Sequence, residues 1–253
     1  MMDENLQYFL LILIRIASFI WISPGFSFKG MPQMAKLALS LGLSVAVFGM
    51  VPIPFETLSL EMYVLIILKE VLVGVAIGYI TQLFFSGIEM AGSFADFQVG
   101  FSMSMAYDPI LGVNTSYYGR VYYWIAMAVF FLANIHHQVI RTLVQSFEYL
   151  PVTQLSFSHM GVEGIVRTFS YVFEIALNLA FPLIIVALLA EIILALLSRT
   201  VPQINVLILG MPFKILLSVI FLFFFLPFLH EGISKVFPDM LKYLQEFIQS
   251  LAN

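Results

Sequence analysis

The sequence predicts an all-α, polytopic membrane-type helical protein. Of the 253 residues, 61% are hydrophobic and only 10% are charged, whereas soluble domains have about 45–50% apolar and about 25% charged residues. Long apolar runs recur along the chain, and each is long enough for a membrane helix of about 20 residues. Helices are expected because lipid offers no hydrogen-bond partners, and a helix satisfies its backbone N–H and C=O groups internally.

The apolar regions are separated by breaks rich in proline and glycine. They cover residues 8–28, 37–55, 62–100, 121–140, 171–197 and 206–229. After Pro238 the pattern changes, because apolar residues now recur at helical spacing with charged and amide side chains between them. This part predicts a short amphipathic helix, suited to packing or to a membrane interface.

The third region carries a stripe of small and polar residues at 3.5-residue spacing. Its members are Glu70, Gly74, Gly78, Gln82, Ser86, Glu89, Ser93, Asp96 and Gly100. The stripe must face protein or water, because a carboxylate is costly among acyl chains. Gly74 and Gly78 form a small-xxx-small pair, which lets another backbone approach closely.

The length of this region leaves two structures open. A single helix from Glu70 to Gly100 would be about 45 Å long, whereas the hydrocarbon core is about 30 Å thick. The helix therefore either breaks near Gly87 or Gly92 or extends beyond the bilayer.

Further polar side chains interrupt or flank the apolar regions. They are Arg15, Lys69, Glu174, Glu191, Asn205 and Lys214. Two interpretations remain open for these residues and for the stripe: they join subunits, or they line a hydrated path. Lys69 and Glu70 are adjacent, so they point about 100° apart on a helix and are not expected to pair with each other.

Several classes of function are excluded by composition and motifs. The chain has no cysteine, which rules out disulfides and thiolate metal sites, and its net charge of -4 without a basic run argues against nucleic acid. His136 and His137 are adjacent and diverge on a helix, so they are not expected to share a metal ion. No nucleotide-binding or nucleophile-elbow motif is present. The sequence therefore predicts no enzyme and no cofactor.

The connection over residues 101–120 mixes flexible apolar side chains with turn residues. Those singled out are Met103, Met105, Tyr107, Asp108, Pro109, Ile110, Leu111, Val113 and Asn114. Methionine adapts to irregular gaps. The segment is therefore either a buried connection between two helices or a deformable apolar plug across an opening.

Several motifs together resemble those of the FliR family, whose members are core subunits of the bacterial flagellar export gate. They are the run 69–78 beginning Lys-Glu, the segment 96–103 reading Asp-Phe-Gln-Val-Gly-Phe-Ser-Met, the run 107–109, the segments 202–205 and 212–214, and Arg15 followed by 23–26. The resemblance covers nearly the whole chain. Virulence-type secretion systems contain a related subunit, so a virulence-type export gate is the alternative.

The resemblance implies a fold of broken and hairpin helices. Residues 1–168 would be similar to FliP and include a gate loop near 101–120, and residues 169–253 would form a FliQ-like hairpin plus the C-terminal amphipathic helix. In the family, the loop matching 103–114 closes the resting channel. The implied location is the bacterial cytoplasmic (inner) membrane at the flagellar basal body, with the assembled core raised toward the extracytoplasmic side.

The implied partners are FliP and FliQ homologues, FlhB, FlhA and flagellar rod proteins, together with membrane lipid. The implied cargo is unfolded flagellar protein. A second class of function follows from the residues alone: a stand-alone ion-coupled transporter in which Glu89 and Asp96 bind a proton or a substrate.

Overall fold

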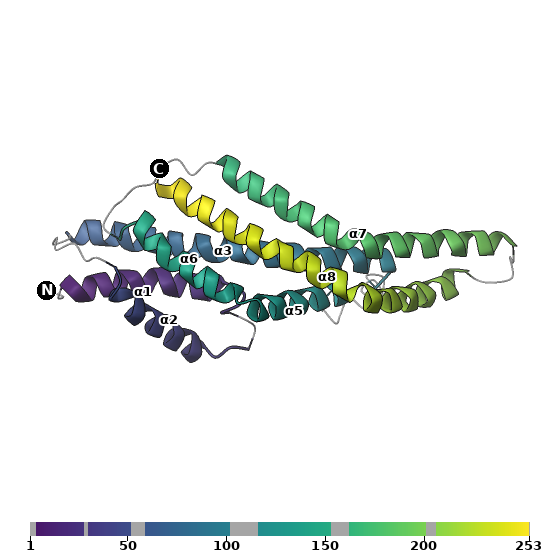
Figure 1. Cartoon of the computed structure of the whole chain (residues 1–253), viewed down its shortest axis with the longest axis horizontal. Helices are drawn as coiled ribbons and strands as arrows, with labels where there is room; N and C mark the ends of the chain where they lie inside the picture. Colours follow the sequence, from purple (N-terminus) through teal and green to yellow (C-terminus); the bar gives the residue numbers. More distant parts are fainter. Residues whose placement is uncertain are drawn as a thin grey trace. The chain divides into compact units, whose positions relative to one another are not determined.

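The computed structural model describes residues 4–27, 30–51, 59–101, 116–152, 162–200 and 206–252, and every regular element in these ranges is an α-helix. The predicted all-α, polytopic membrane-type fold is confirmed. Along the chain (Figure 1), the helices are α1 (Glu4–Ile22), α2 (Gln33–Phe48), α3 (Leu60–Val99), α5 (Tyr117–Leu132), α6 (Ile135–Tyr149), α7 (Val162–Thr200) and α8 (Val206–Ala252). The predicted gate residues Met103–Asn114 and also Asn205 lie outside the described residues.

The chain forms two compact units, each assembled from separate stretches of sequence. The first contains residues 1–84, 130–168 and 237–253, and the second contains residues 85–129 and 169–236. Helices α3, α5, α7 and α8 therefore contribute to both units. The predicted division at residue 168 concerns similarity to two sister subunits, and it stays a prediction.

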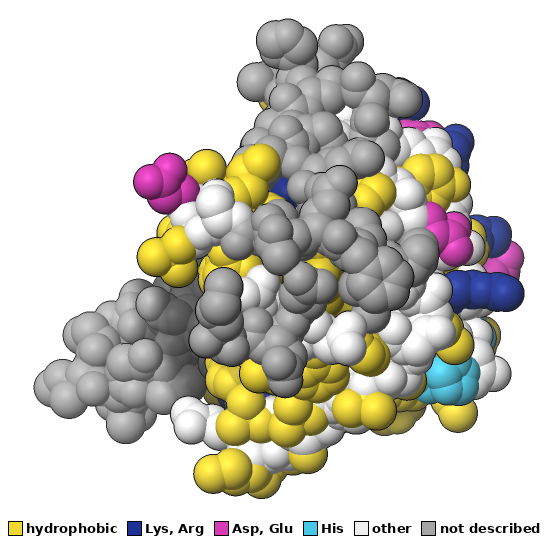
Figure 2. Space-filling model, turned by 90° about the vertical axis from the view of Figure 1, so that its left-hand side faces the viewer, with side chains coloured by type: hydrophobic (Ala, Val, Ile, Leu, Met, Phe, Trp, Pro, Cys, Tyr) yellow, Lys and Arg dark blue, Asp and Glu magenta, His cyan; other side chains and the backbone are white. Residues whose placement is uncertain are grey.

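Within the described residues, four helices are long and apolar enough to cross a membrane, and the bent pair α5 and α6 adds a fifth span if it is taken as one. The longest apolar spans lie in α3, α7 and α8. Many large hydrophobic side chains are exposed in both units, including Phe223 and Phe224 of α8 and Ile192 of α7. Figure 2 shows one face on which hydrophobic side chains cover much of the described surface while charged ones gather along one side. A surface of this kind is expected to be covered by lipid or protein.

The core of the first unit is built on the contact between α1 and the first half of α3, which lie side by side (Figure 1). Leu11, Ile12, Ile16, Phe19 and Ile20 of α1 are fully or almost fully buried. Their i, i+4 spacing places them on one face of the helix. Helix α1 also meets α2, where the rings of Phe9 and Phe48 pack edge to face with centroids 5.7 Å apart.

Helix α3 settles the length question, because it continues through Gly87 and Gly92 without a break. Its 40 residues correspond to about 60 Å. It ends where Gly100 adopts φ +103°, a conformation that residues with a Cβ rarely adopt. The two glycines serve packing instead: a Cβ at Gly87 would lie 2.7 Å from Val172 of α7, and one at Gly92 would collide with the backbone of α5.

The apolar region 121–140 is not a single straight helix. Helices α5 and α6 meet at a bend of 72°. Asn134 lies at the bend with φ 56° and ψ 24°, in the left-handed region. Asparagine tolerates this conformation better than most residues with a Cβ, and a left-handed residue cannot continue an α-helix.

The amphipathic segment after Pro238 is not a separate helix. It is the last part of α8, which runs unbroken over 47 residues. The predicted amphipathic pattern is confirmed, since Met240, Leu244 and Ile248 are buried while Lys242 and Gln249 are exposed. The expectation of a new element failed because proline does not always end a helix when neighbouring helices support it.

Candidate functional site

The first unit contains a buried ionic cluster centred on Arg15. The guanidinium donates two hydrogen bonds to the Glu70 carboxylate, one of them from Nη2 to Oε1 at 2.9 Å, and both side chains are fully buried. Its remaining donors reach Ser146 Oγ at 3.1 Å and the Leu150 carbonyl oxygen at 2.8 Å. The guanidinium carbon also lies 4.0 Å from the centre of the Phe147 ring. One side chain of α1 thus connects α3 with the end of α6.

Lys69 belongs to the same cluster, which contradicts the expectation that it does not pair with Glu70. Its Nζ lies 3.1 Å from Glu70 Oε1 and donates to the carbonyl oxygen of Pro151 at 2.7 Å. Adjacent positions do diverge on a helix, but the lysine stem is long and flexible enough to bring the ammonium group back. The carbonyl oxygens of Pro151 and Val152, which follow α6, accept hydrogen bonds from this ammonium group.

The cluster holds two cations and one anion, and its surroundings balance the excess. Backbone carbonyl oxygens after the C-terminal end of α6 accept hydrogen bonds from both cations. The C-terminal end of a helix carries a partial negative charge and leaves carbonyl groups unpaired, so cations are favoured there. Arg15, Lys69 and Glu70 therefore find their partners inside the chain, and for these residues the structure shows internal ion pairing.

Gly74 and Gly78 also pack within the chain. A Cβ at Gly74 would collide with the Arg15 carbonyl oxygen and lie 2.9 Å from Ser18 Cβ. One at Gly78 would lie 3.0 Å from the Phe19 carbonyl oxygen and 3.1 Å from Ile22 Cβ. The backbone approach predicted by the small-xxx-small pair is made by α1. The approach also brings Arg15 close to Glu70, one turn before Gly74.

The second unit contains a polar cluster centred on Asp96, which is 4% exposed. Its carboxylate accepts hydrogen bonds from the Ser116 hydroxyl and from the Tyr118 backbone N–H at 3.1 Å and 3.2 Å. Ser116 Oγ in turn accepts from the Gly119 N–H at 2.7 Å. The Tyr118 hydroxyl pairs with Ser218 Oγ of α8 at 2.6 Å.

A second polar group in this unit lies on the α7–α8 hairpin. Lys214 Nζ lies 3.1 Å from Glu191 Oε2, and Gln98 Nε2 donates to the same oxygen at 3.3 Å. Glu191 is 55% exposed and Lys214 is 16% exposed. In water, such an exposed pair contributes little to stability.

The remaining stripe residues lie elsewhere along α3 and directly after it. Gln82, Ser86, Ser93 and Gly100 are partly buried, and Glu89 is exposed. Glu174 of α7 is also exposed. The structure therefore separates the stripe into an N-terminal part that packs on α1, a C-terminal part that binds the start of α5, and an exposed carboxylate between them.

Sequence reasoning missed the hydroxyl partners of these clusters. These partners are Ser116, Ser146, Tyr118 and Ser218, and nothing in their spacing links them to Asp96 or Arg15. Ser116 alone carries a local signal, because serine directly before a helix is a common N-cap.

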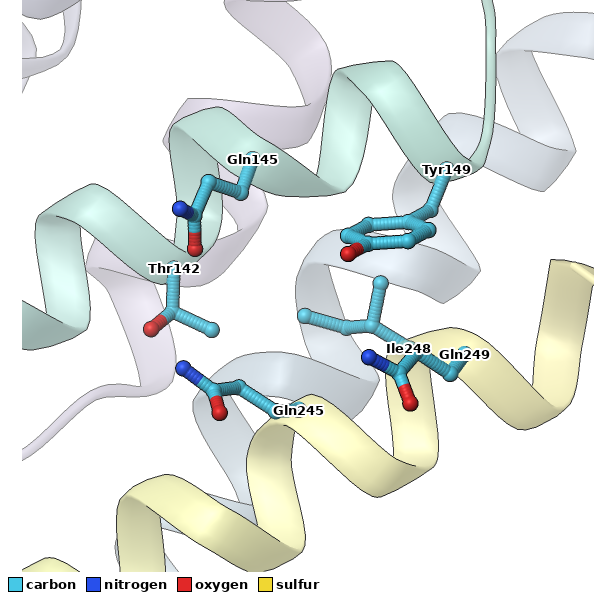
Figure 3. Close-up of a pocket in the computed structure, with 6 residues that line it drawn as sticks. All are labelled: Thr142, Gln145, Tyr149, Gln245, Ile248 and Gln249. Atoms are coloured by element: carbon cyan, nitrogen blue, oxygen red, sulfur yellow. The ribbon is translucent and has the colours of Figure 1, made fainter.

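A small open pocket of about 150 Å³ lies between α6 and the last part of α8 (Figure 3). Its lining residues are Thr142, Gln145, Tyr149, Gln245, Ile248 and Gln249. The lining carries amide and hydroxyl groups but no charge. In the described part of the chain, no group of three or more His, Asp or Glu side chains could hold a metal ion.

Comparison with known proteins decides the family. Residues 6–240 match the family described as bacterial export proteins, family 1. The chain belongs to this family. It is a membrane-type member, since several of its helices are apolar enough to span a bilayer. The resemblance noted from the motifs is confirmed.

Similar proteins include flagellar biosynthetic proteins and a Yop translocation protein. The flagellar biosynthetic protein FliR of Bacillus subtilis is 32% identical over 90% of this chain and 90% of its own length. FliR of Aquifex aeolicus is 28% identical over 99% of this chain and 97% of its own length. The Yop proteins translocation protein T of Yersinia pestis is 32% identical over 64% of this chain and 62% of its own length.

Proposed function

We propose that this export-family member is a non-enzymatic core subunit of the flagellar type III protein export gate. In this proposal it forms, with FliP and FliQ homologues, the channel for unfolded flagellar proteins in the cytoplasmic membrane. The observation that carries the proposal is the alignment with a FliR protein over 90% of both chains. A virulence-type gate is the alternative, and the shorter alignment with the Yersinia protein favours the flagellar assignment.

The proposal predicts that the chain needs partners. Large exposed hydrophobic side chains such as Phe223, Phe224 and Phe228 must be covered by lipid or by sister subunits. Co-expression with FliP and FliQ homologues, followed by native mass measurement, tests this directly. We expect a complex containing all of these proteins. A homogeneous, stable preparation of the chain alone, with no association on co-expression, would contradict the gate assignment.

Within this function we assign residues 103–114 to the plug that closes the resting channel. The support is the family resemblance of the segment and its flexible apolar composition. Deleting it should leave the complex assembled but make the membrane permeable to ions and small molecules. A membrane that stays tight around an assembled complex would remove the plug role.

Glu89 decides between the two interpretations of the stripe, because it is the exposed carboxylate between the two packed parts. Glu89→Lys separates them. Loss of the complex means that the acid joins subunits, and an intact complex without export means that it lines the path. A chain that works as a transporter without its partners would instead support the ion-coupled alternative.

A further inference from the structure

Hydrogen bonds of Asp96 join the end of α3 to the start of α5. The chain leaves α3 at Gly100 and Phe101, whose N–H groups donate to the Asp96 carbonyl oxygen at 3.0 Å and 3.1 Å. It is described again from Ser116, whose hydroxyl donates to the Asp96 carboxylate. Asp96 therefore holds the outgoing chain with its backbone and the returning chain with its side chain.

The negative charge of the Asp96 carboxylate is stabilised by α5 and not by its own helix α3. An acidic residue in the last turn of α3 lies at the negative end of that helix dipole, which is unfavourable. Its carboxylate is satisfied at the positive end of α5, where the Tyr118 N–H donates to both oxygens at 3.1 Å and 3.2 Å. Ser116 completes the cap by accepting from Gly119. The cap of α5 thus comes partly from another helix.

The helix ends have further contacts that require close approach. A Cβ at Gly92 would collide with the Gly119 nitrogen, so the two backbones touch at this point. The Phe101 ring packs on Tyr117 and Tyr118, with centroids 5.2 Å and 5.6 Å apart. Among these contacts, only the Asp96 carboxylate provides a charged, directional bond to α5.

We propose that Asp96 is a positioning residue, which clasps the C-terminal end of α3 to the N-terminal end of α5 and so fixes both ends of the connection between them. The clasp consists of Asp96, Ser116 and the Tyr118 N–H. This inference rests on the proposed function only where export is measured, because the clasp itself is a property of the chain.

The test uses the absence of cysteine from the sequence. Spin labels attached through Phe101→Cys and Tyr117→Cys report the distance between the two helix ends in the complex assembled in membranes. Asp96→Leu removes both acceptor oxygens while keeping a side chain of similar size, and Asp96→Asn keeps one acceptor oxygen. The control is Glu61→Gln, at an exposed acid in the first turn of α3.

We expect a narrow distance distribution in the parent and in Glu61→Gln, a broad one in Asp96→Leu, and an intermediate one in Asp96→Asn. The separated population should rise about fivefold in Asp96→Leu, as for the loss of a helix cap. If Asp96→Leu does not accumulate, the comparison of Asp96→Asn with the control decides. An unchanged distribution in the Asp96 variants would overturn the proposal.

A second readout separates positioning from any direct role of the carboxylate. A short cross-linker between the same two introduced thiols should restore export to Asp96→Leu, because it replaces the clasp by a covalent link. Export that stays lost although the linked helix ends are held together would also overturn the positioning role. If the parent without the introduced cysteines fails to support export, the proposed function is contradicted, while the distance measurement still tests the clasp.

Discussion

Arg15 and Glu70 form a two-point ion pair between α1 and α3 in which neither side chain is exposed to solvent. The pair does not stand alone, because Lys69 contacts the same carboxylate and both cations reach carbonyl oxygens following α6. Glu70 is therefore the shared anion of the cluster. Removing it has a different consequence from removing either cation.

We expect Glu70→Ala to destabilise the protein by about 3–5 kcal/mol, because it leaves two buried cations without their anion. Arg15→Ala should cost less, since Glu70 keeps Lys69 at 3.1 Å. Thermal unfolding of the purified complex in detergent measures both. Glu61→Ala, at an exposed acid of the same helix, is the control. Equal losses for Glu70→Ala and Arg15→Ala would show that the shared-anion description is wrong.

The glycines of α3 should differ in their tolerance of a methyl group. Gly74→Ala places a Cβ against the Arg15 carbonyl oxygen and is expected to cost about 1–3 kcal/mol. Gly78→Ala should cost less, because its nearest contact lies at 3.0 Å. Gly42→Ala in α2 has open space and should stabilise by about 0.5–1 kcal/mol. The order of the three melting temperatures checks this, and a Gly74→Ala protein as stable as Gly42→Ala would contradict the close approach of α1.

The bend between α5 and α6 should respond to the residue at position 134. Asn134→Gly is expected to be neutral or slightly stabilising because glycine adopts positive φ without penalty. Asn134→Val should cost about 1–3 kcal/mol, since a β-branched side chain is strained at φ 56°. Denaturant unfolding of the two variants gives the comparison. Equal stability of the glycine and valine variants would mean that position 134 does not hold the left-handed conformation.

The Tyr118–Ser218 contact should contribute a measurable coupling between α5 and α8. Both residues are buried and their hydroxyl oxygens lie 2.6 Å apart. We expect Tyr118→Phe and Ser218→Ala each to destabilise, with a coupling of about 0.5–1.5 kcal/mol in a double-mutant cycle. A coupling indistinguishable from zero would mean that the two hydroxyls do not bond.

The sequence was sufficient to predict the class of fold and most of the helices. Hydrophobicity and length decide these features locally, so the apolar regions correspond well to α1, α3, α7 and the first part of α8. The boundary at Asn134 was not predicted, and the boundary predicted at Pro238 is wrong because α8 continues through it. At both positions the outcome depends on packing between helices, because the same asparagine or proline can end, bend or continue a helix.

In the candidate site, too, local features could be predicted from the sequence, whereas contacts between helices could not. Part of the small and polar stripe packs inside the chain, and Gly74 and Gly78 do allow a close backbone approach. The partner of each residue could not be predicted. Arg15 and Glu70 are 55 positions apart, and Asp96 and Ser116 are 20 apart. Neither pair has the separation of three or four residues that makes two side chains neighbours on one helix. Such pairs are set by the tertiary arrangement alone.

The Arg15 cluster also constrains how the protein is made. Arg15 is synthesised 55 residues before Glu70 and 135 residues before the Leu150 carbonyl group that completes its shell. An unpaired arginine is costly in a membrane interior. The first helix is therefore expected to remain at the insertion machinery, or to lie at the membrane surface, until the third helix emerges. Biogenesis of this chain would then proceed by joint insertion of helices and not one helix at a time.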